Sequence, residues 1–245
     1  MDAPENPFDR LAASEYADLV ARAERAVREI TGTLAGHPAF DVARGEPKAG
    51  DVDDETTSRT GALRRVRAGR ATQALLAEAA ARCAAEDAAD AVWLGASLAD
   101  LGEVVGSTRQ AARKRWPDLG RVHRARRWVA GHADDLVTVL GMVRDEAAGY
   151  TAPEGADEAL DRAVRALDDA LRAVLRDRDS GSVCDPRTGR PVRWRRLAEV
   201  VDGELRTLVD LAVPTTPRSD TALAAGRGVL AHHDAVLAEP ASATA

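Results

Sequence analysis

Apolar residues recur at three- and four-residue steps through most of this chain, and that spacing restricts it to a helical fold. The second half shows four such stretches, at residues 121–148, 156–177, 194–213 and 219–238. Two of their seams are Val129, His132, Leu136, Val139, Val143 and Leu160, Val164, Leu167, Leu171, Val174. Because amphipathic helices with short connections bury such stripes against one another, the sequence predicts an antiparallel helical bundle over residues 121–240.

Two further helices are expected nearer the N-terminus. A seam of Tyr16, Leu19, Val20, Ala23, Val27 and Ile30 predicts a helix within residues 1–34 that begins at an N-cap, Ser14. A second helix is expected from about Gly61 to Ala91, with Gly69 as a candidate break. Its expected inward residues are Leu63, Val66, Leu75, Leu76, Ala79, Ala80 and Cys83. Residues 35–58 combine Gly, Pro and an acidic cluster, so we predict a flexible linker there.

One small β-hairpin is predicted near residues 182–193, where SVCDPRTGRPVRW places a Pro and a Gly between Val183 and Val192. The fold class is otherwise all-α, so this hairpin would be the only sheet. A cluster of basic residues surrounds it, namely Arg187, Arg190, Arg193, Arg195 and Arg196. These arginines can contact a DNA backbone as a wing does, or they can pair with acidic neighbours in the bundle, which is the simpler interpretation.

Charge is distributed unevenly along the chain. The total is −6, from 34 Lys and Arg against 40 Asp and Glu, so binding to a polyanion would have to depend on a local patch. Residues 85–105 carry five acidic residues and no basic one, which gives −5, whereas residues 106–127 carry eight basic residues and Asp118, which gives +7. A helix that packs only for structure normally mixes both signs on its solvated face, so the positive segment indicates an anionic partner.

The sign of the charge changes within SLADLGEVVGSTRQAARKRW, residues 97–116. The apolar face of a first short helix consists of Leu98, Leu101, Val104 and Val105. That helix is expected to end at Gly106, and Thr108 is expected to cap a second helix that ends at Trp116 and Pro117. Gly102 lies where two crossing helices would approach closely, and the small Ala112 would pack back against the first helix.

This segment resembles the bacterial helix-turn-helix, in particular the three-helix modules of actinobacterial regulators, whose second half often reads GVSRQAA before a basic and aromatic ending. Here it reads GSTRQAARKRW, and the resemblance covers about residues 72–116. Ser107 and Arg115 stand where that family commonly has apolar residues, and we expect Trp116 to supply the missing packing. The resemblance implies a DNA-binding module over residues 59–120.

The geometry of such a module assigns roles to individual residues. At the start of the recognition helix, Arg109 is expected to read guanine, Gln110 adenine, and Arg113 a neighbouring base or phosphate. Thr108 and the backbone N–H groups beside it suit a phosphate. Three more residues are expected to clamp the DNA backbone, namely Lys114, Arg121 and Arg124.

The sequence therefore predicts a protein that binds specific double-stranded DNA, a transcriptional regulator that forms a homodimer through its bundle. The alternative is a helical interaction module whose basic helix binds an acidic partner protein. A third interpretation adds a small-molecule effector pocket in the bundle, although aromatic residues make up only 3% of the chain.

Other classes of function have no support in the sequence. Cys83 and Cys184 are far apart and lack the spacing of a zinc site, so we expect no metal and a reduced, cytoplasmic protein. No catalytic or nucleotide-binding motif is present, so we expect neither an enzyme nor a cofactor. The N-terminus MDAPENPFDR lacks a signal sequence, and no apolar run suits a membrane span.

Overall fold

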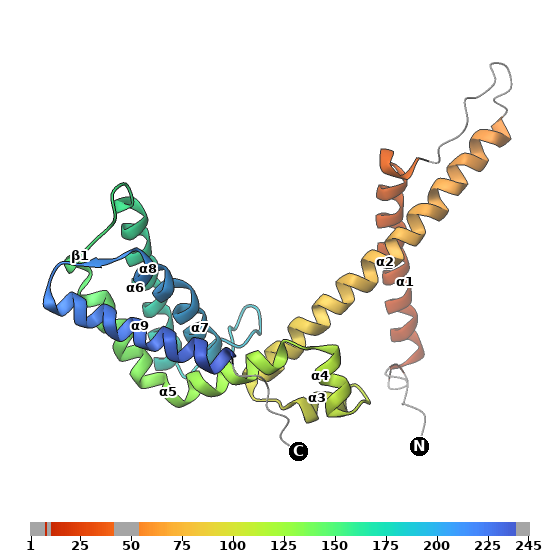
Figure 1. The fold of residues 1–245 in the computed structure, drawn as a ribbon. Helices are drawn as coiled ribbons and strands as arrows, with labels where there is room; N and C mark the ends of the chain where they lie inside the picture. Colours follow the sequence, from red (N-terminus) through yellow and green to blue (C-terminus); the bar gives the residue numbers. More distant parts are fainter. Residues whose placement is uncertain (1–7, 9–10, 42–53, 239–245) are drawn as a thin grey trace. The chain divides into compact units, whose positions relative to one another are not determined.

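The structure is a computed structural model that describes residue 8 and residues 11–41 and 54–238, and the fold is all-α, as the sequence predicted (Figure 1). The chain divides into two compact units, residues 1–85 and 86–245, which are taken one at a time below. Within the described residues, no helix has both the length and the apolar character needed to cross a membrane.

The first unit contains α1 (Ala13–Ala35), a 3₁₀ turn η1 (Pro38–Phe40) and the first part of α2 (Asp54–Leu94). The predicted helix over 14–34 is confirmed as α1, but Ser14 is not its N-cap, because the helix already includes Ala13. The carboxylate of Glu15 accepts the backbone N–H of Ala12 at 2.9 Å and so satisfies one of the free donors at this helix start.

The helix α2 is longer than predicted and buries a different face. It runs through Gly69 without a break, and residues 54–58, which were predicted as linker, are already helical; residues 42–53 of that predicted linker lie outside the described residues. The expected inward positions Leu63, Val66 and Leu75 are exposed, Val66 by 66%. The contact with α1 instead uses small residues, because the Thr72 hydroxyl lies 3.0 Å from the Thr31 hydroxyl and donates to the Ala68 carbonyl.

In the second unit, the last turns of α2 pack with α3 (Leu98–Val104), α4 (Arg109–Arg115) and the start of α5 (Leu119–Asp145). These four segments share a small hydrophobic core. Its buried members are Ala88, Val92, Leu101, Ala112, Trp116 and Leu119. The short helices α3 and α4 are thus held between two long ones.

The remainder of the unit is the predicted helical bundle. It consists of α5, α6 (Asp157–Asp179), α7 (Arg193–Val200), a π-helical turn η3 (Val201–Leu205), α8 (Arg206–Leu211) and α9 (Pro217–Ala238). The single helix predicted over 194–213 is therefore interrupted by the π-helical turn and ends at Leu211. Both predicted seams contribute buried residues to one continuous core, among them Leu136, Val143, Leu167 and Leu171.

The long helix α5 bends at His132, whose backbone angles of φ −127° and ψ 16° are not helical. The His132 Nδ1 atom lies 2.8 Å from the Trp128 carbonyl, and because a carbonyl oxygen only accepts, this ring nitrogen carries the proton and donates it. A side chain thus enters the i to i−4 hydrogen-bond ladder, which is a recognised cause of kinks in helices without proline.

The small sheet lies elsewhere than predicted. A 3₁₀ turn η2 (Ala147–Gly149) leads into β1 (Tyr150–Thr151), which pairs antiparallel with β2 (Val213–Pro214), Tyr150 opposite Pro214. Residues 182–193 form a hairpin-like turn with one isolated bridge between Cys184 and Pro191. Two backbone hydrogen bonds of 2.9 Å flank this bridge, from the Asp185 N–H to the Arg190 carbonyl and from the Val192 N–H to the Val183 carbonyl.

Candidate nucleic-acid interface

The turn between α3 and α4 approaches α3 so closely that position 102 must be glycine. A Cβ atom added to Gly102 would lie 2.8 Å from the Ser107 carbonyl oxygen and 3.1 Å from the Thr108 carbonyl carbon. The Ser107 N–H donates to the Gly102 carbonyl at 2.7 Å, and Gly106 turns the chain with φ +63°. The close approach expected at Gly102 is therefore present, although its contacts are with the turn and the first residue of α4.

Both short helices begin with a side-chain cap. The Ser97 hydroxyl accepts the N–H of Asp100 at 3.2 Å, and the Asp100 carboxylate accepts the Ser97 N–H at 2.8 Å. Hydrogen bonding to the Asp100 carboxylate, first from the Ser97 backbone N–H and then from the Ser97 side chain, lowers the pKa of Asp100. At α4 the Thr108 hydroxyl accepts the Ala111 N–H at 3.2 Å, so Thr108 caps the helix as expected.

The side of α4 that faces the core is formed by Ala112, which is fully buried, and by Trp116, which is 8% exposed. Ser107 is exposed, so Trp116 supplies the apolar packing that the turn lacks, as expected. On α3, Leu98 and Leu101 face the core, but Val104 is 84% exposed and Val105 is also exposed, contrary to expectation. Val104 follows Gly102 by two residues, or about 200° around the helix, and so lies opposite the closely packed face.

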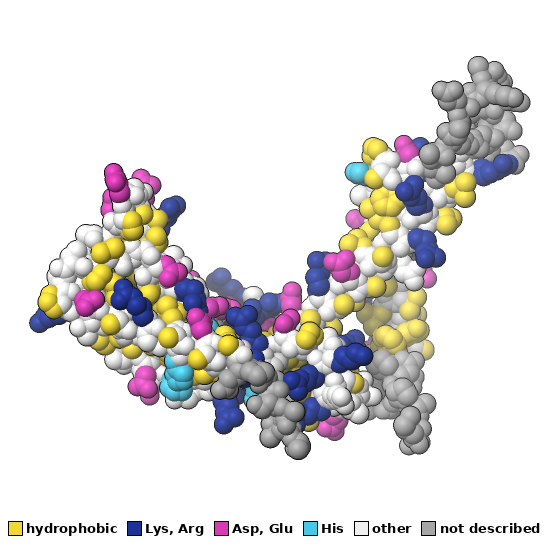
Figure 2. Space-filling model, viewed as in Figure 1, with side chains coloured by type: hydrophobic (Ala, Val, Ile, Leu, Met, Phe, Trp, Pro, Cys, Tyr) yellow, Lys and Arg dark blue, Asp and Glu magenta, His cyan; other side chains and the backbone are white. Residues whose placement is uncertain are grey.

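The opposite side of α4 is a basic surface. Arg109, Gln110, Arg113 and Lys114 are all exposed on it, and Arg121 is exposed on the first turn of α5. Among the described residues, no acidic side chain forms an ion pair with Arg109, Lys114 or Arg121. Figure 2 shows Lys and Arg side chains gathered over this region. Of the predicted site residues, the structure thus brings Thr108, Arg109, Gln110, Arg113 and Lys114 together on one short helix.

Arg124 is placed differently from the other predicted contacts. It is half-buried, and its Nη2 atom donates to the Leu237 carbonyl near the end of α9 at 3.0 Å. Arg126 likewise donates through Nε to the Trp93 carbonyl at the end of α2, at 2.8 Å. These two guanidinium groups connect α5 to its neighbours, whereas Arg121 remains directed to solvent.

The acidic end of α2 pairs with two arginines of the basic turn at 187–196. Arg190 pairs with Glu86 and Asp90, and Arg195 pairs with Asp90 at 2.8 Å. The hydrogen bond that Arg190 donates to the Glu86 carboxylate, assisted by the charge of Asp90, raises the pKa of Arg190. Pairing with acidic neighbours, the simpler of the two interpretations of these arginines, is therefore present for Arg190 and Arg195, and also for Arg196, which pairs with Asp177 at 3.0 Å. Sequence inspection could not identify the partners on α2, because about a hundred residues separate them from the turn.

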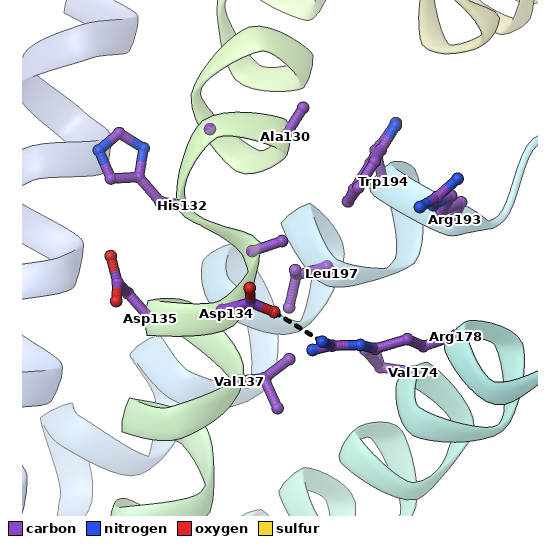
Figure 3. A pocket seen from close by; sticks show the side chains of 12 residues that line it. Ala130, His132, Asp134, Asp135, Val137, Val174, Arg178, Arg193, Trp194 and Leu197 are labelled. Atoms are coloured by element: carbon purple, nitrogen blue, oxygen red, sulfur yellow. Dashed lines mark ion pairs between the residues drawn. The ribbon is translucent and has the colours of Figure 1, made fainter.

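A second feature of the same unit is a cavity at the kink of α5, with a volume of about 450 Å³ (Figure 3). It lies between α5, the C-terminal end of α6 and the first turn of α7. An ion pair of 2.7 Å joins Asp134 to Arg178 at its wall, and the Arg193 guanidinium lies 4.5 Å from the ring centre of Trp194. The sequence analysis missed this cavity; the pair Gly131–His132 within an apolar seam was the available signal for a kink.

One group of side chains has the composition of a metal site. Ligand atoms of Asp202, His233 and Asp234 lie within 4.8 Å of one another. However, Arg206 binds both carboxylates, at 3.0 Å from Asp202 and 2.6 Å from Asp234, and it lowers the pKa of Asp234. The guanidinium therefore already supplies the positive charge that these carboxylates need.

Comparison with known protein families, with curated proteins and with solved structures finds no match to this chain. The function of the basic surface is accordingly argued from its geometry and its charge.

Proposed function

We propose that this protein binds specific sequences of double-stranded DNA through α4 and regulates transcription in the cytoplasm. One observation supports this most strongly: a short helix presents Arg109, Gln110 and Lys114 to solvent from a tightly built turn, and no acid among the described residues pairs with its Arg109 or Lys114. Arginines that serve packing within this protein would be expected to pair with acidic neighbours, as Arg190 and Arg195 of the turn at 187–196 do.

In this proposal α4 enters the major groove with its first turn toward the bases. Arg109 hydrogen-bonds guanine O6 and N7, Gln110 hydrogen-bonds adenine N6 and N7, and Arg113 contacts the next base or phosphate. Lys114 and Arg121 contact phosphates and fix the orientation. Because α4 has only seven residues, one copy would bury little surface. We therefore propose a homodimer on two half-sites, about 34 Å apart.

The decisive experiment selects the sequences that the protein binds from a random duplex pool. Fluorescence anisotropy then measures the affinity of each protein variant for the selected duplex and for random duplex. The triple variant Arg109→Ala/Gln110→Ala/Arg113→Ala should lose its preference for the selected site by about 100-fold or more, since each good base contact is worth about 1–3 kcal/mol. The matched control is Arg162→Ala/Arg165→Ala, which removes two exposed charges from α6 and should retain the preference. Unchanged selectivity in the triple variant would refute the assignment of α4.

Anisotropy measured with random duplex at several salt concentrations distinguishes DNA binding from the alternative, in which the basic helix binds an acidic protein. A phosphate-binding surface loses affinity for random duplex steeply as salt rises, with a slope of about −0.9 per phosphate contacted. Lys114→Ala/Arg121→Ala should make this slope shallower by about 2. If the wild-type protein shows no salt-dependent affinity for duplex at low salt, the DNA-binding function is wrong and the acidic protein partner is favoured.

A further inference from the structure

The cavity at the kink of α5 has the dimensions of a small-molecule site. Its volume of about 450 Å³ lies within the range of about 300–1,000 Å³ that is typical of ligand pockets. The kink itself contributes to the space, because Gly131 has no side chain and the backbone at His132 leaves helical geometry. Nothing lies within 4 Å of a Cβ added to Gly131, so this wall of the cavity is open.

The walls combine an apolar base with one aromatic side. Val137 of α5, Val174 of α6 and Leu197 of α7 line the cavity and belong to the bundle core or pack against it. Trp194 is partly buried at the start of α7, and in Figure 3 its ring stands across the cavity from Ala130. An apolar or aromatic group can therefore be covered on several sides at once.

The charges around the cavity favour an anion. Asp134 and Arg178 cancel one another through their 2.7 Å ion pair. His132 and Asp135 also line the cavity, and in Figure 3 their side chains lie on the opposite side of the α5 ribbon from Trp194 and Arg193. Arg193, which lies against Trp194, forms no ion pair with any acid among the described residues. One positive charge beside an aromatic ring therefore remains.

We propose that this cavity binds a small planar aromatic carboxylate. Its ring would lie against Trp194 and the apolar base, and its carboxylate would pair with the guanidinium of Arg193. Trp194 supplies a rigid flat surface for stacking, and the Arg193 fork matches the two oxygens of a carboxylate.

The position of the cavity connects it to α4. The helix α5 begins at Leu119, which packs in the same small core as Ala112 and Trp116, and it reaches the cavity one turn after Trp128. A ligand that favours one bend at His132 would shift the segment that supports α4. This regulatory step depends on the proposed DNA binding, whereas occupancy of the cavity does not.

Isothermal titration calorimetry on the full-length protein tests the binding. The probes are 1-naphthoate, the neutral 1-naphthamide and the cationic 1-naphthylmethylammonium, which share one ring system. We expect naphthoate to bind most tightly, and Arg193→Ala to weaken it by about 10-fold or more, the loss of one charge-assisted hydrogen bond. Ala130→Leu should also weaken it by filling the cavity. The control Arg187→Ala removes an exposed arginine outside the cavity and should change the affinity by less than about 2-fold.

The outcomes are distinct. Absence of saturable naphthoate binding, equal binding of the ammonium probe, or an Arg193→Ala variant that binds as the wild type does would each overturn the proposed site. Anisotropy of a selected duplex with and without saturating naphthoate then tests the regulation: a change in affinity that Ala130→Leu abolishes supports it, and no change overturns it. If the protein binds naphthoate but no duplex, the proposed DNA function fails while the cavity site stands.

Discussion

Gly102 illustrates how a single missing side chain fixes the geometry of the turn. The Ser107 carbonyl occupies the space that a Cβ would need, and the Ser107 N–H bonds back to Gly102. The start of α4, and therefore the direction in which Arg109 and Gln110 project, is set by this contact. The sequence indicated a close approach at this position but could not show which backbone atoms would make it.

We predict that Gly102→Ala lowers the free energy of unfolding by about 1–3 kcal/mol, because backbone atoms have to move to accept the methyl group. The matched control is Gly141→Ala in α5, where an added Cβ meets nothing within 4 Å and should stabilise the helix by about 0.4–1 kcal/mol. Urea unfolding followed by circular dichroism measures both. Equal effects of the two substitutions would contradict the close approach.

Tyr150 provides a pH-dependent contribution to stability. Its hydroxyl donates to the Val143 carbonyl at 2.9 Å, and burial, with the nearby charge of Glu146, raises the pKa of Tyr150 to about 12. An unfolded tyrosine ionises near pH 10, so the folded state holds this proton more tightly. The contribution is thus complete below about pH 10 and is lost as pH rises toward 12.

Tyr150→Phe should cost about 1 kcal/mol at pH 7, through the lost hydrogen bond. The difference in unfolding free energy between wild type and variant should shrink as the pH rises above 10, because only the wild type has this titration. Urea unfolding at a series of pH values from 7 to 11 measures the difference. A difference that stays constant over this range would show that the phenol proton is not held by the fold.

At the scale of the element, α1 carries an apolar stripe that the described residues do not cover. Tyr16, Val20, Ala23, Val27 and Ile30 alternate in steps of four and three, which is coiled-coil spacing, yet no residue of α1 is buried. Val20 and Val27 remain 37% and 38% exposed. Charges of both signs flank the stripe, so that a second copy of α1 would not meet a surface of like charge. We therefore expect the proposed homodimer to form through α1 rather than through the bundle.

Val20→Glu/Val27→Glu should convert a dimer into a monomer, since two carboxylates would have to be buried in the seam. Val213→Glu is the control, because Val213 is also exposed but lies in the small sheet of the second unit. Sedimentation equilibrium measures the mass of each variant. A dimeric double variant, or a monomeric wild type, would rule out this surface.

Periodicity located the helices better than it located their buried faces. The buried seams of α5 and α6 were predicted correctly because each helix has its apolar residues on one face and packs that face into the same core. In α2 the apolar residues occur on more than one face, so no single stripe identified Ala68 and Thr72 as the contact with α1. The kink in α5 coincides with a hydrogen bond from the His132 side chain to the Trp128 carbonyl of the same helix. The spacing of apolar residues gives no sign of such a bond.

The candidate site was predictable where its residues are contiguous. Arg109, Gln110, Arg113 and Lys114 lie on one short helix that Thr108 caps, so the local sequence was enough to group them. Arg124 was grouped with them by charge, but its hydrogen bond goes to Leu237, a residue 113 positions away. The cavity was missed for the same reason, because three helices distant in sequence contribute to it.

At the scale of the whole molecule, the fold decides which of the charged segments seen in the sequence pair with one another. The chain carries a net charge of −6. Ion pairs with the end of α2 offset the charges of Arg190 and Arg195, which would otherwise contribute to a second basic surface at the turn 187–196. The densest run of positive charge in the second unit is residues 106–127, which carry eight basic residues and one acidic residue.

This concentration of charge has a consequence for how a duplex would encounter the protein. At physiological salt, charges are felt over only about 8 Å, so a duplex is attracted most where positive charge is concentrated, as it is on residues 106–127. Productive collisions would be restricted to orientations that already present α4 to the groove. The negative remainder of the molecule would thus reject misoriented encounters and shorten the time spent on non-target DNA, without any contribution to the affinity of the final complex.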